Sequence, residues 1–170
     1  IVQFFANRGY AVLQVNFRGS TGYGRRFREL AIGEYAGKMH DDLVDAVRWA
    51  VAQGVADPGR VAIHGGSYGG YSALVGMTFT PEVFACSVAV VPISNLLSFY
   101  EKIPPYWQHS YVPLFHKYVG DPRRPEDRRR FLEIIARQAN RLDSIIDDLL
   151  MLSQVEQQDD MLLGANVGGD

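Results

Sequence analysis

The sequence has few of the features that mark disulfide-rich, membrane-spanning or nucleic-acid-binding proteins. Its single cysteine, Cys86, excludes an internal disulfide and leaves the redox compartment open. No apolar run approaches the roughly 20 residues of a membrane span. The formal net charge of -2 gives no argument for nucleic acid or for an anionic membrane surface. We therefore expect neither among the partners and, with the compartment unknown, favour the cytoplasm.

The most informative stretch is a nucleophile-elbow motif, Gly-x-Ser-x-Gly, with Gly65, Ser67 and Gly69 at its defining positions. Residues 61–64 read as a short buried strand, and residues 71–79 read as an apolar helix. A serine at a sharp strand-to-helix turn needs side-chain-free neighbours two residues away, so that strand and helix can approach. The alternative is a glycine-rich turn with an incidental serine. The strand before it and the helix after it favour a nucleophile, Ser67, with the Tyr68 backbone N–H as an oxyanion donor.

The remaining pattern predicts an α/β protein with a parallel sheet and flanking helices. The expected elements, in chain order, are a helix end at 1–8, a strand at 10–17, a helix at 41–53, the strand and helix of the motif, and a strand at 84–91. Asp41 and Asp42 are interpreted as acids in a first helical turn rather than as catalytic or metal-binding groups. The aromatic residues within 92–122 either wall a substrate pocket or pack against a missing neighbour. We expect no cofactor and no metal.

Several motifs together resemble the peptidase domain of the prolyl oligopeptidase family, in particular its dipeptidyl- and acylaminoacyl-peptidase branches. They are Asn-Phe-Arg-Gly-Ser-Thr-Gly-Tyr-Gly at 16–24, Asp-Asp-Leu at 41–43, Ala-Asp-Pro at 56–58, Gly-Gly-Ser-Tyr-Gly-Gly-Tyr at 65–71 and Val-Gly-Asp-Pro at 119–122. The resemblance covers about three quarters of the chain. It implies a partial α/β-hydrolase fold, with Ser67 as nucleophile and Tyr68 as the backbone oxyanion donor. It also implies short peptides or acylated amino acids as substrates.

The chain departs from that family in the residues that would activate the serine. In the family the triad acid and then the histidine follow the nucleophile along the chain. The histidines present, at 40, 64, 109 and 116, do not occupy that late position, and Asp170 ends a segment with only a faint likeness to the strand before the acid. Because no general base can be assigned, we expect the hydrolase activity of this chain to be impaired.

Residues 131–157 contain neither glycine nor proline and carry an apolar stripe at heptad spacing, consisting of Ile135, Ala139, Leu142, Ile146 and Leu149. Residues 141–156 resemble a dimerisation helix of sensor histidine kinases, although nothing matches the phospho-accepting histidine. The stripe is expected to pack within the chain or to form a homo-oligomer. We therefore divide the chain into a partial hydrolase domain at 1–130, an amphipathic helix at 131–158 and a flexible tail at 159–170. The alternative to an enzyme is a non-catalytic chimera of a hydrolase fragment and a dimerisation helix.

Overall fold

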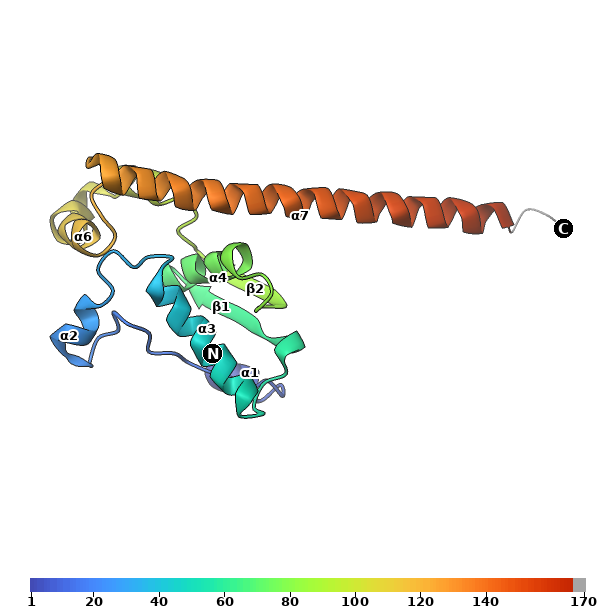
Figure 1. Cartoon of the computed structure of the whole chain (residues 1–170), viewed down its shortest axis with the longest axis horizontal. Coiled ribbons are helices and arrows are strands. Elements are labelled where there is room, and N and C mark those ends of the chain that lie inside the picture. Colours follow the sequence, from blue (N-terminus) through green and yellow to red (C-terminus); the bar gives the residue numbers. More distant parts are fainter. Residues whose placement is uncertain (167–170) are drawn as a thin grey trace.

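The computed structural model describes the backbone of residues 1–166, and the side chains of residues 1–147 and of residue 151. The elements follow in the order α1 (Val2–Ala6), α2 (Gly24–Glu29), α3 (Lys38–Ala52), the 3-10 turn η1 (Pro58–Arg60), β1 (Ala62–Gly66), α4 (Tyr68–Phe79), β2 (Cys86–Val90), α5 (Leu96–Glu101), α6 (Pro105–Tyr118) and α7 (Pro125–Asn166). The class is α/β, as the sequence predicted, and Figure 1 shows α7 running past the other elements as a long rod.

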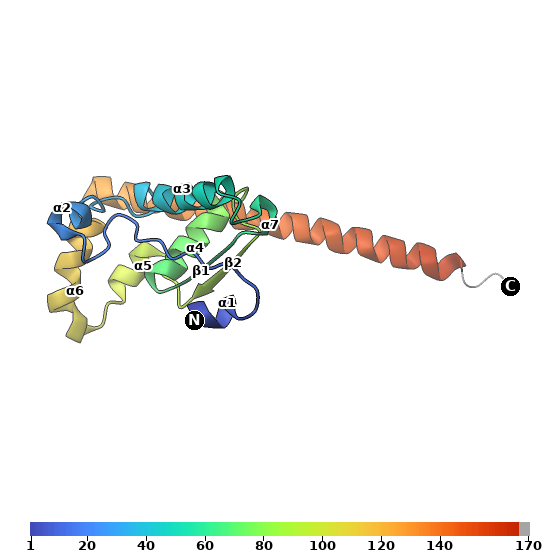
Figure 2. The same cartoon turned by 90° about the horizontal axis from the view of Figure 1, so that it is seen from below.

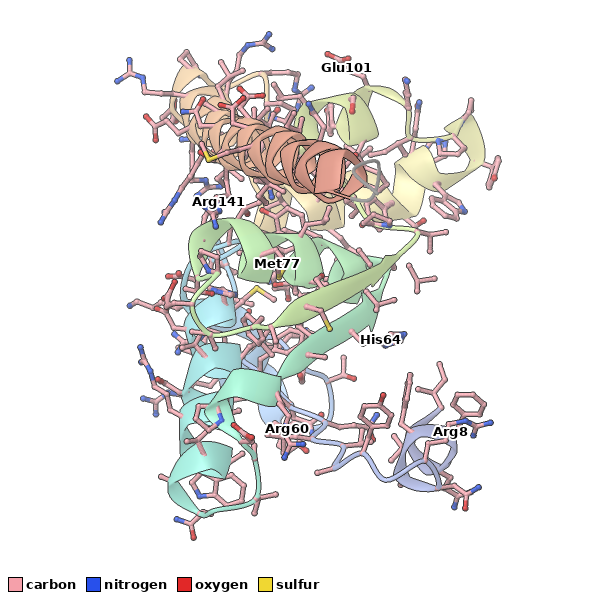
Figure 3. The ribbon with its side chains drawn as sticks, turned by 90° about the vertical axis from the view of Figure 1, so that its right-hand side faces the viewer. Arg8, Arg60, His64, Met77, Glu101 and Arg141 are labelled. Atoms are coloured by element: carbon pink, nitrogen blue, oxygen red, sulfur yellow. The ribbon has the colours of Figure 1, made fainter. Side chains whose placement is uncertain are left out.

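The sheet consists of β1 and β2, which pair in parallel from Ala62 opposite Cys86 to Gly66 opposite Val90. The connection between them is α4, an apolar helix that packs on one face of the sheet. Side chains on the other face, including those of Val88 and Val90, are exposed. Viewed along α7, the layers are α7, α4 and then the sheet (Figure 3). Because α4 follows β1 directly, the strand-to-helix turn between them lies at the end of the sheet.

The strand predicted at residues 10–17 is wrong for the described chain, where these residues are irregular and mostly exposed. A strand requires a partner for its backbone N–H and C=O groups, and the register of the sheet includes only β1 and β2. An apolar run alone does not supply that partner. The strand predicted at 84–91 is present in shortened form as β2, and the predicted helix at 41–53 begins earlier, at Lys38.

The core lies where α4, α5, α6 and the start of α7 meet. Its buried cluster comprises Tyr71, Val75, Ile93, Leu96, Phe115, Val119 and Phe131. The aromatic segment at 92–122 is thus largely helical, and its side chains fill this core. Phe131 is fully buried, so the first turns of α7 belong to the same packed body as the hydrolase-like segment.

The helix α7 begins at Pro125 and continues to Asn166, through residues 159–166 for which the sequence predicted a flexible tail. Residues 167–170 of that tail, Asp170 among them, lie outside the described residues. The division into domains at residue 130 stays a prediction. No helix in the described part of the chain combines the length and the apolar character needed to cross a membrane.

The side of α7 that packs on the body is not the heptad stripe predicted from the sequence. Phe131 and Gln138 are buried, whereas Leu142 and Ile146 are each 53% exposed. The side chain of Leu149, the last predicted stripe residue, lies outside the described residues. Figure 2 shows the second half of α7 extending well past the other elements. Within its described length the stripe is therefore solvent-exposed at Ala139, Leu142 and Ile146 and half-buried at Ile135 in a single copy of the chain.

Candidate active site

Ser67 occupies the sharp turn between β1 and α4 that the motif predicts. Its φ of 54° and ψ of -115° fall in a region that residues other than glycine rarely adopt, and it is the N-cap residue of α4. The Ser67 backbone N–H donates to the Val90 carbonyl at 3.0 Å, and the Ser67 carbonyl accepts from the Tyr71 N–H at 3.0 Å. The turn is thus held by β2 on one side and by the first turn of α4 on the other.

The glycines around Ser67 are not equivalent. A Cβ atom added to Gly65 would lie 2.4 Å from the Gly69 carbonyl group, so β1 and α4 meet here through bare backbone. A Cβ added to Gly70 would lie 2.9 Å from the Val90 carbonyl oxygen. A Cβ added to Gly69 would meet nothing within 4 Å. The expectation that Gly69 must lack a side chain is therefore wrong, because Gly70 rather than Gly69 is the helix residue that faces β2.

The Ser67 side chain is exposed, and it takes part in none of the hydrogen bonds found among the described side chains. The first amides of α4, beginning with that of Tyr68, have no carbonyl one turn earlier in the helix to bind. Together with the helix dipole they favour negative charge beside Ser67. The local arrangement therefore offers an accessible hydroxyl next to an anion-stabilising helix end.

None of the four histidines, all of them described, hydrogen-bonds the Ser67 hydroxyl. His40 Nε2 lies 2.8 Å from Thr80 Oγ1, and burial lowers the pKa of His40. His116 Nε2 lies 2.9 Å from the Tyr100 hydroxyl, against whose ring it stacks. His64 lies on the exposed face of β1 beside Phe5 (Figure 3), and His109 is exposed on α6. The described residues thus place no imidazole on the serine.

Tyr68 anchors the turn through its side chain. The ring packs between Phe17 and Tyr35, with centroids 5.5 Å and 4.8 Å away, and its hydroxyl reaches the Met39 sulfur at 3.5 Å. Burial raises the pKa of Tyr68 to about 12. A phenol held this way leaves only the backbone of Tyr68 at the turn. This is compatible with its assignment as an oxyanion donor, which stays a prediction.

A hollow of about 300 Å³ opens beside this aromatic cluster. Phe17, Tyr35 and Met39 line one side of it, and Tyr111 and Phe115 of α6 line another. The aromatic segment at 92–122 therefore contributes to a pocket wall, one of the two roles that the sequence left open, and also to the core of the chain itself. Among the described residues, no group of three or more His, Cys, Asp or Glu side chains is arranged to hold a metal ion.

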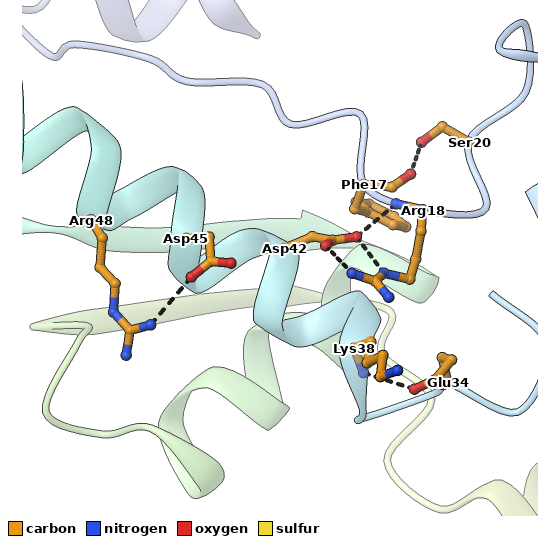
Figure 4. A network of polar contacts seen from close by, with 8 residues as sticks. All are labelled: Phe17, Arg18, Ser20, Glu34, Lys38, Asp42, Asp45 and Arg48. Atoms are coloured by element: carbon orange, nitrogen blue, oxygen red, sulfur yellow. Dashed lines mark hydrogen bonds and ion pairs between the residues drawn. The ribbon is translucent and has the colours of Figure 1, made fainter. Parts of the chain in front are cut away.

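The glycine-rich loop after residue 17 is fixed by an ion pair that the sequence did not reveal (Figure 4). Arg18 Nε and Nη2 donate to the two oxygens of Asp42 at 2.8 Å and 2.6 Å, and the Arg18 backbone N–H also donates to Oδ2. These hydrogen bonds from Arg18 lower the pKa of Asp42. Asp42 lies beyond the first turn of α3, so its interpretation as a helix-start acid is wrong. Only Asp41 lies in that turn.

Comparison with known proteins decides the family. The model described as "Prolyl oligopeptidase family" matches residues 1–125. The chain belongs to the prolyl oligopeptidase family. It is 60% identical over 121 residues to dipeptidyl aminopeptidase BIII of Pseudoxanthomonas mexicana, covering 71% of this chain and 17% of that protein. It is 51% identical over 130 residues to dipeptidyl peptidase family member 6 of Caenorhabditis elegans, covering 76% of this chain and 17% of that protein.

The fold comparison agrees with this assignment. The crystal structure of a puromycin hydrolase superposes with a TM-score of 0.66 at 30% sequence identity, covering 81% of this chain and 19% of that one. The sheet and its helices are thus part of an α/β-hydrolase peptidase fold, as the sequence predicted. A second model, "His Kinase A (phospho-acceptor) domain", matches residues 114–158 and overlaps the first at 114–125. The two resemblances noted in the sequence are both confirmed, each for its own part of the chain.

Sequence reasoning found the strand-to-helix turn at Ser67 but missed the residues that fix its surroundings. Gly70 had a signal, because a glycine directly after Gly-x-Ser-x-Gly is one more than the motif requires. The pairing of Arg18 with Asp42, 24 residues apart, had none, since opposite charges at that separation do not identify each other. The side-chain role of Tyr68 was hidden because its ring partners Phe17 and Tyr35 lie in loops rather than in a periodic element.

Proposed function

We propose that the hydrolase-like segment is the nucleophile-bearing part of a serine peptidase that acts on short peptides or acylated amino acids. The observation that carries this proposal is the exposed Ser67 at positive φ, directly ahead of α4. A serine in that strained conformation needs surrounding structure to hold it, and such strain concentrates at functional sites. The names of the two dipeptidyl peptidase relatives support peptides as the substrate class.

The chemistry we assign to the site is acyl transfer. The Ser67 oxygen attacks the carbonyl carbon of the scissile bond and passes its proton to a general base. The resulting oxyanion is stabilised by the Tyr68 N–H at the start of α4. When the carbon–nitrogen bond breaks, the leaving amine takes a proton and the acyl group stays on Ser67 as an ester. Water then hydrolyses this ester and restores the free serine.

We further propose that these 170 residues are impaired as a hydrolase on their own. The support is that His40 and His116 are engaged by other residues and that no described histidine bonds Ser67. Loss of a triad member lowers the rate by roughly 10⁴- to 10⁶-fold, leaving only binding and oxyanion stabilisation. The elbow would then persist as architecture with little nucleophilic activity.

Labelling with a fluorophosphonate, followed by intact-mass analysis, tests both statements. These reagents phosphonylate serines that are activated by a base beside an oxyanion site. For an impaired chain we expect no adduct within hours, in the protein and in Ser67→Ala alike, with both folded by circular dichroism. A single adduct that disappears in Ser67→Ala would overturn the impairment and would support the peptidase assignment directly.

A second candidate function, from a different class, is self-association through α7. The specific observation is that Leu142 and Ile146, two members of the predicted stripe, stay exposed while another side of the helix packs on the body. The His Kinase A match at 114–158 supports the same segment. In this alternative the chain is a non-catalytic chimera that acts as a homo-oligomer.

Sedimentation analysis of Leu142→Asp/Ile146→Asp beside the unchanged chain tests this second function. A double charge on the stripe should convert an oligomer to a monomer, because two buried apolar contacts are replaced by repulsive ones. Ser144→Asp is the matched control, since Ser144 is exposed on the same helix but outside the heptad stripe. A monomeric unchanged chain would refute self-association, and equal loss in the control would refute the stripe as its site.

A further inference from the structure

The exposed stripe of α7 is longer than its sequence pattern alone indicated. Leu132 is 49% exposed and precedes Ala139 by seven residues, and Ile146 follows after seven more. Leu142 occupies the alternate seam position between Ala139 and Ile146. The described stripe thus spans residues 132–146, and apart from the half-buried Ile135 the body leaves it uncovered. An apolar seam of this form fits another helix lying alongside it.

The two halves of α7 carry opposite charge. Between Pro125 and Arg141 the helix contains five arginines, at 128, 129, 130, 137 and 141, against three acids at 126, 127 and 133. From residue 142 to residue 166 it contains six acids, at 143, 147, 148, 156, 159 and 160, and neither lysine nor arginine. The sign of the charge therefore changes near the middle of the exposed stripe, between Arg141 and Asp143.

The arginines at the start of α7 differ in how they are used. Arg130 donates to the Gly33 carbonyl and to that of Val119, so it ties α7 to the body. Arg128 and Arg129 are exposed and enter no ion pair within the described part of the chain. Arg128 lies 31 residues from Asp159, and Arg129 lies 31 residues from Asp160. This separation is about 46 Å along a helix that rises 1.5 Å per residue. Asp159 and Asp160 of the same helix therefore cannot reach them.

We propose that α7 pairs with α7 of a second copy of this chain in antiparallel orientation, an inference that rests on the self-association proposed above. In this arrangement the arginine-rich half of each helix lies along the acidic half of the other. A parallel pair would instead align arginines with arginines and acids with acids, which is unfavourable at short range. The antiparallel pair is centred near residue 144, so Leu142 of one copy meets Ile146 of the other at the middle of the seam.

A charge swap between the two ends of α7 tests the orientation. Arg128→Glu/Arg129→Glu and Asp159→Arg/Asp160→Arg are each compared with the unchanged chain by sedimentation equilibrium at low salt. Each pair of changes should raise the dimer dissociation constant on the order of tenfold, because a two-fold pair loses four exposed charge contacts. All four changes together should restore it to within about threefold, since the charges are then complementary again. Circular dichroism at 222 nm verifies that α7 stays helical in each variant.

The outcomes separate the orientation from self-association itself. If the variant with all four changes dimerises more weakly than either double variant, the antiparallel pairing is overturned. Without that pairing the swapped charges stay about 46 Å apart, well beyond the roughly 10 Å Debye length at 0.1 M salt, and cannot compensate each other. That result leaves self-association standing. A monomeric unchanged chain overturns both. If all four changes together restore the dimer dissociation constant that each double variant raised, the antiparallel pair is supported, because only that arrangement brings the two ends of α7 together.

A distance measurement provides a second, independent readout. In a Cys86→Ser background, a spin label at Glu133→Cys lies 11 residues from the proposed centre. The two labels of an antiparallel dimer are then separated by about 33 Å along the axis. In a parallel dimer they face each other across helix axes roughly 8–10 Å apart, and the labels lie within about 20 Å. The short distance overturns the proposal, and the long one supports it.

Discussion

The glycines of the elbow offer the sharpest test of the structure, because the motif treats Gly65 and Gly69 alike and the geometry does not. An added Cβ at Gly65 would overlap the backbone of Gly69 at 2.4 Å, and backbone atoms cannot move aside as a side chain can. Overpacking of a well-packed site costs about 1–3 kcal/mol, and more where nothing yields. We therefore expect Gly65→Ala to lower the free energy of unfolding by about 3 kcal/mol or more.

The neighbouring glycines provide matched controls for that change. At Gly69 an added Cβ meets open space inside α4, so Gly69→Ala should be neutral or stabilising by up to about 1 kcal/mol, the difference in helix propensity. Gly70→Ala should fall between the two, because its Cβ would lie 2.9 Å from the Val90 carbonyl oxygen. Urea unfolding followed by tryptophan fluorescence gives the three values. If Gly65→Ala and Gly69→Ala proved equally stable, the close approach of β1 and α4 would be refuted.

Three further changes test the core, the ion pair and the aromatic cluster. Phe131→Ala should lower the free energy of unfolding by about 3–5 kcal/mol, because the ring is fully buried. Phe4→Ala, at a half-exposed ring, should lower it by under about 1 kcal/mol. Equal losses would refute the burial of the start of α7. Asp42→Asn should remove about 1 kcal/mol at pH 7 through the lost Arg18 contact. Because that contact lowers the pKa of Asp42 in the folded state, its contribution to stability is present above pH 4 and lost in more acidic solution. The free energy of unfolding of Asp42→Asn should therefore fall less on acidification than that of the unchanged chain. Because burial raises the pKa of Tyr68 in the folded state to about 12, the free energy of unfolding should fall as pH rises from 10 to 12. At pH 11 this loss should be about 1 kcal/mol smaller in Tyr68→Phe, which has no phenol to ionise.

What the sequence predicted well is local, and what it missed depends on contacts between distant segments. The elbow was found because glycine, serine and the change from strand to helix lie within a few residues of one another. The strand at 10–17 failed because its apolar character says nothing about whether a partner strand lies beside it. For α7 the period indicated a helix from residue 131, whereas the helix begins at Pro125 and buries Phe131 in the core. Two apolar sides of one helix cannot be ranked from their spacing alone.

The elbow and the catalytic activity proposed for it have different structural requirements. The conformation of Ser67 is held by contacts within the β1–α4–β2 unit, namely its N–H bond to the Val90 carbonyl and the approach of Gly65 to Gly69. These contacts offset a backbone strain of about 1–3 kcal/mol at Ser67, and they need only two strands and one helix. Proton transfer from the Ser67 hydroxyl needs in addition a base aimed at that oxygen, and none of the described histidines hydrogen-bonds it. An intact elbow thus requires only β1, α4 and β2. Whether a base is in place is reported only by the reactivity of Ser67.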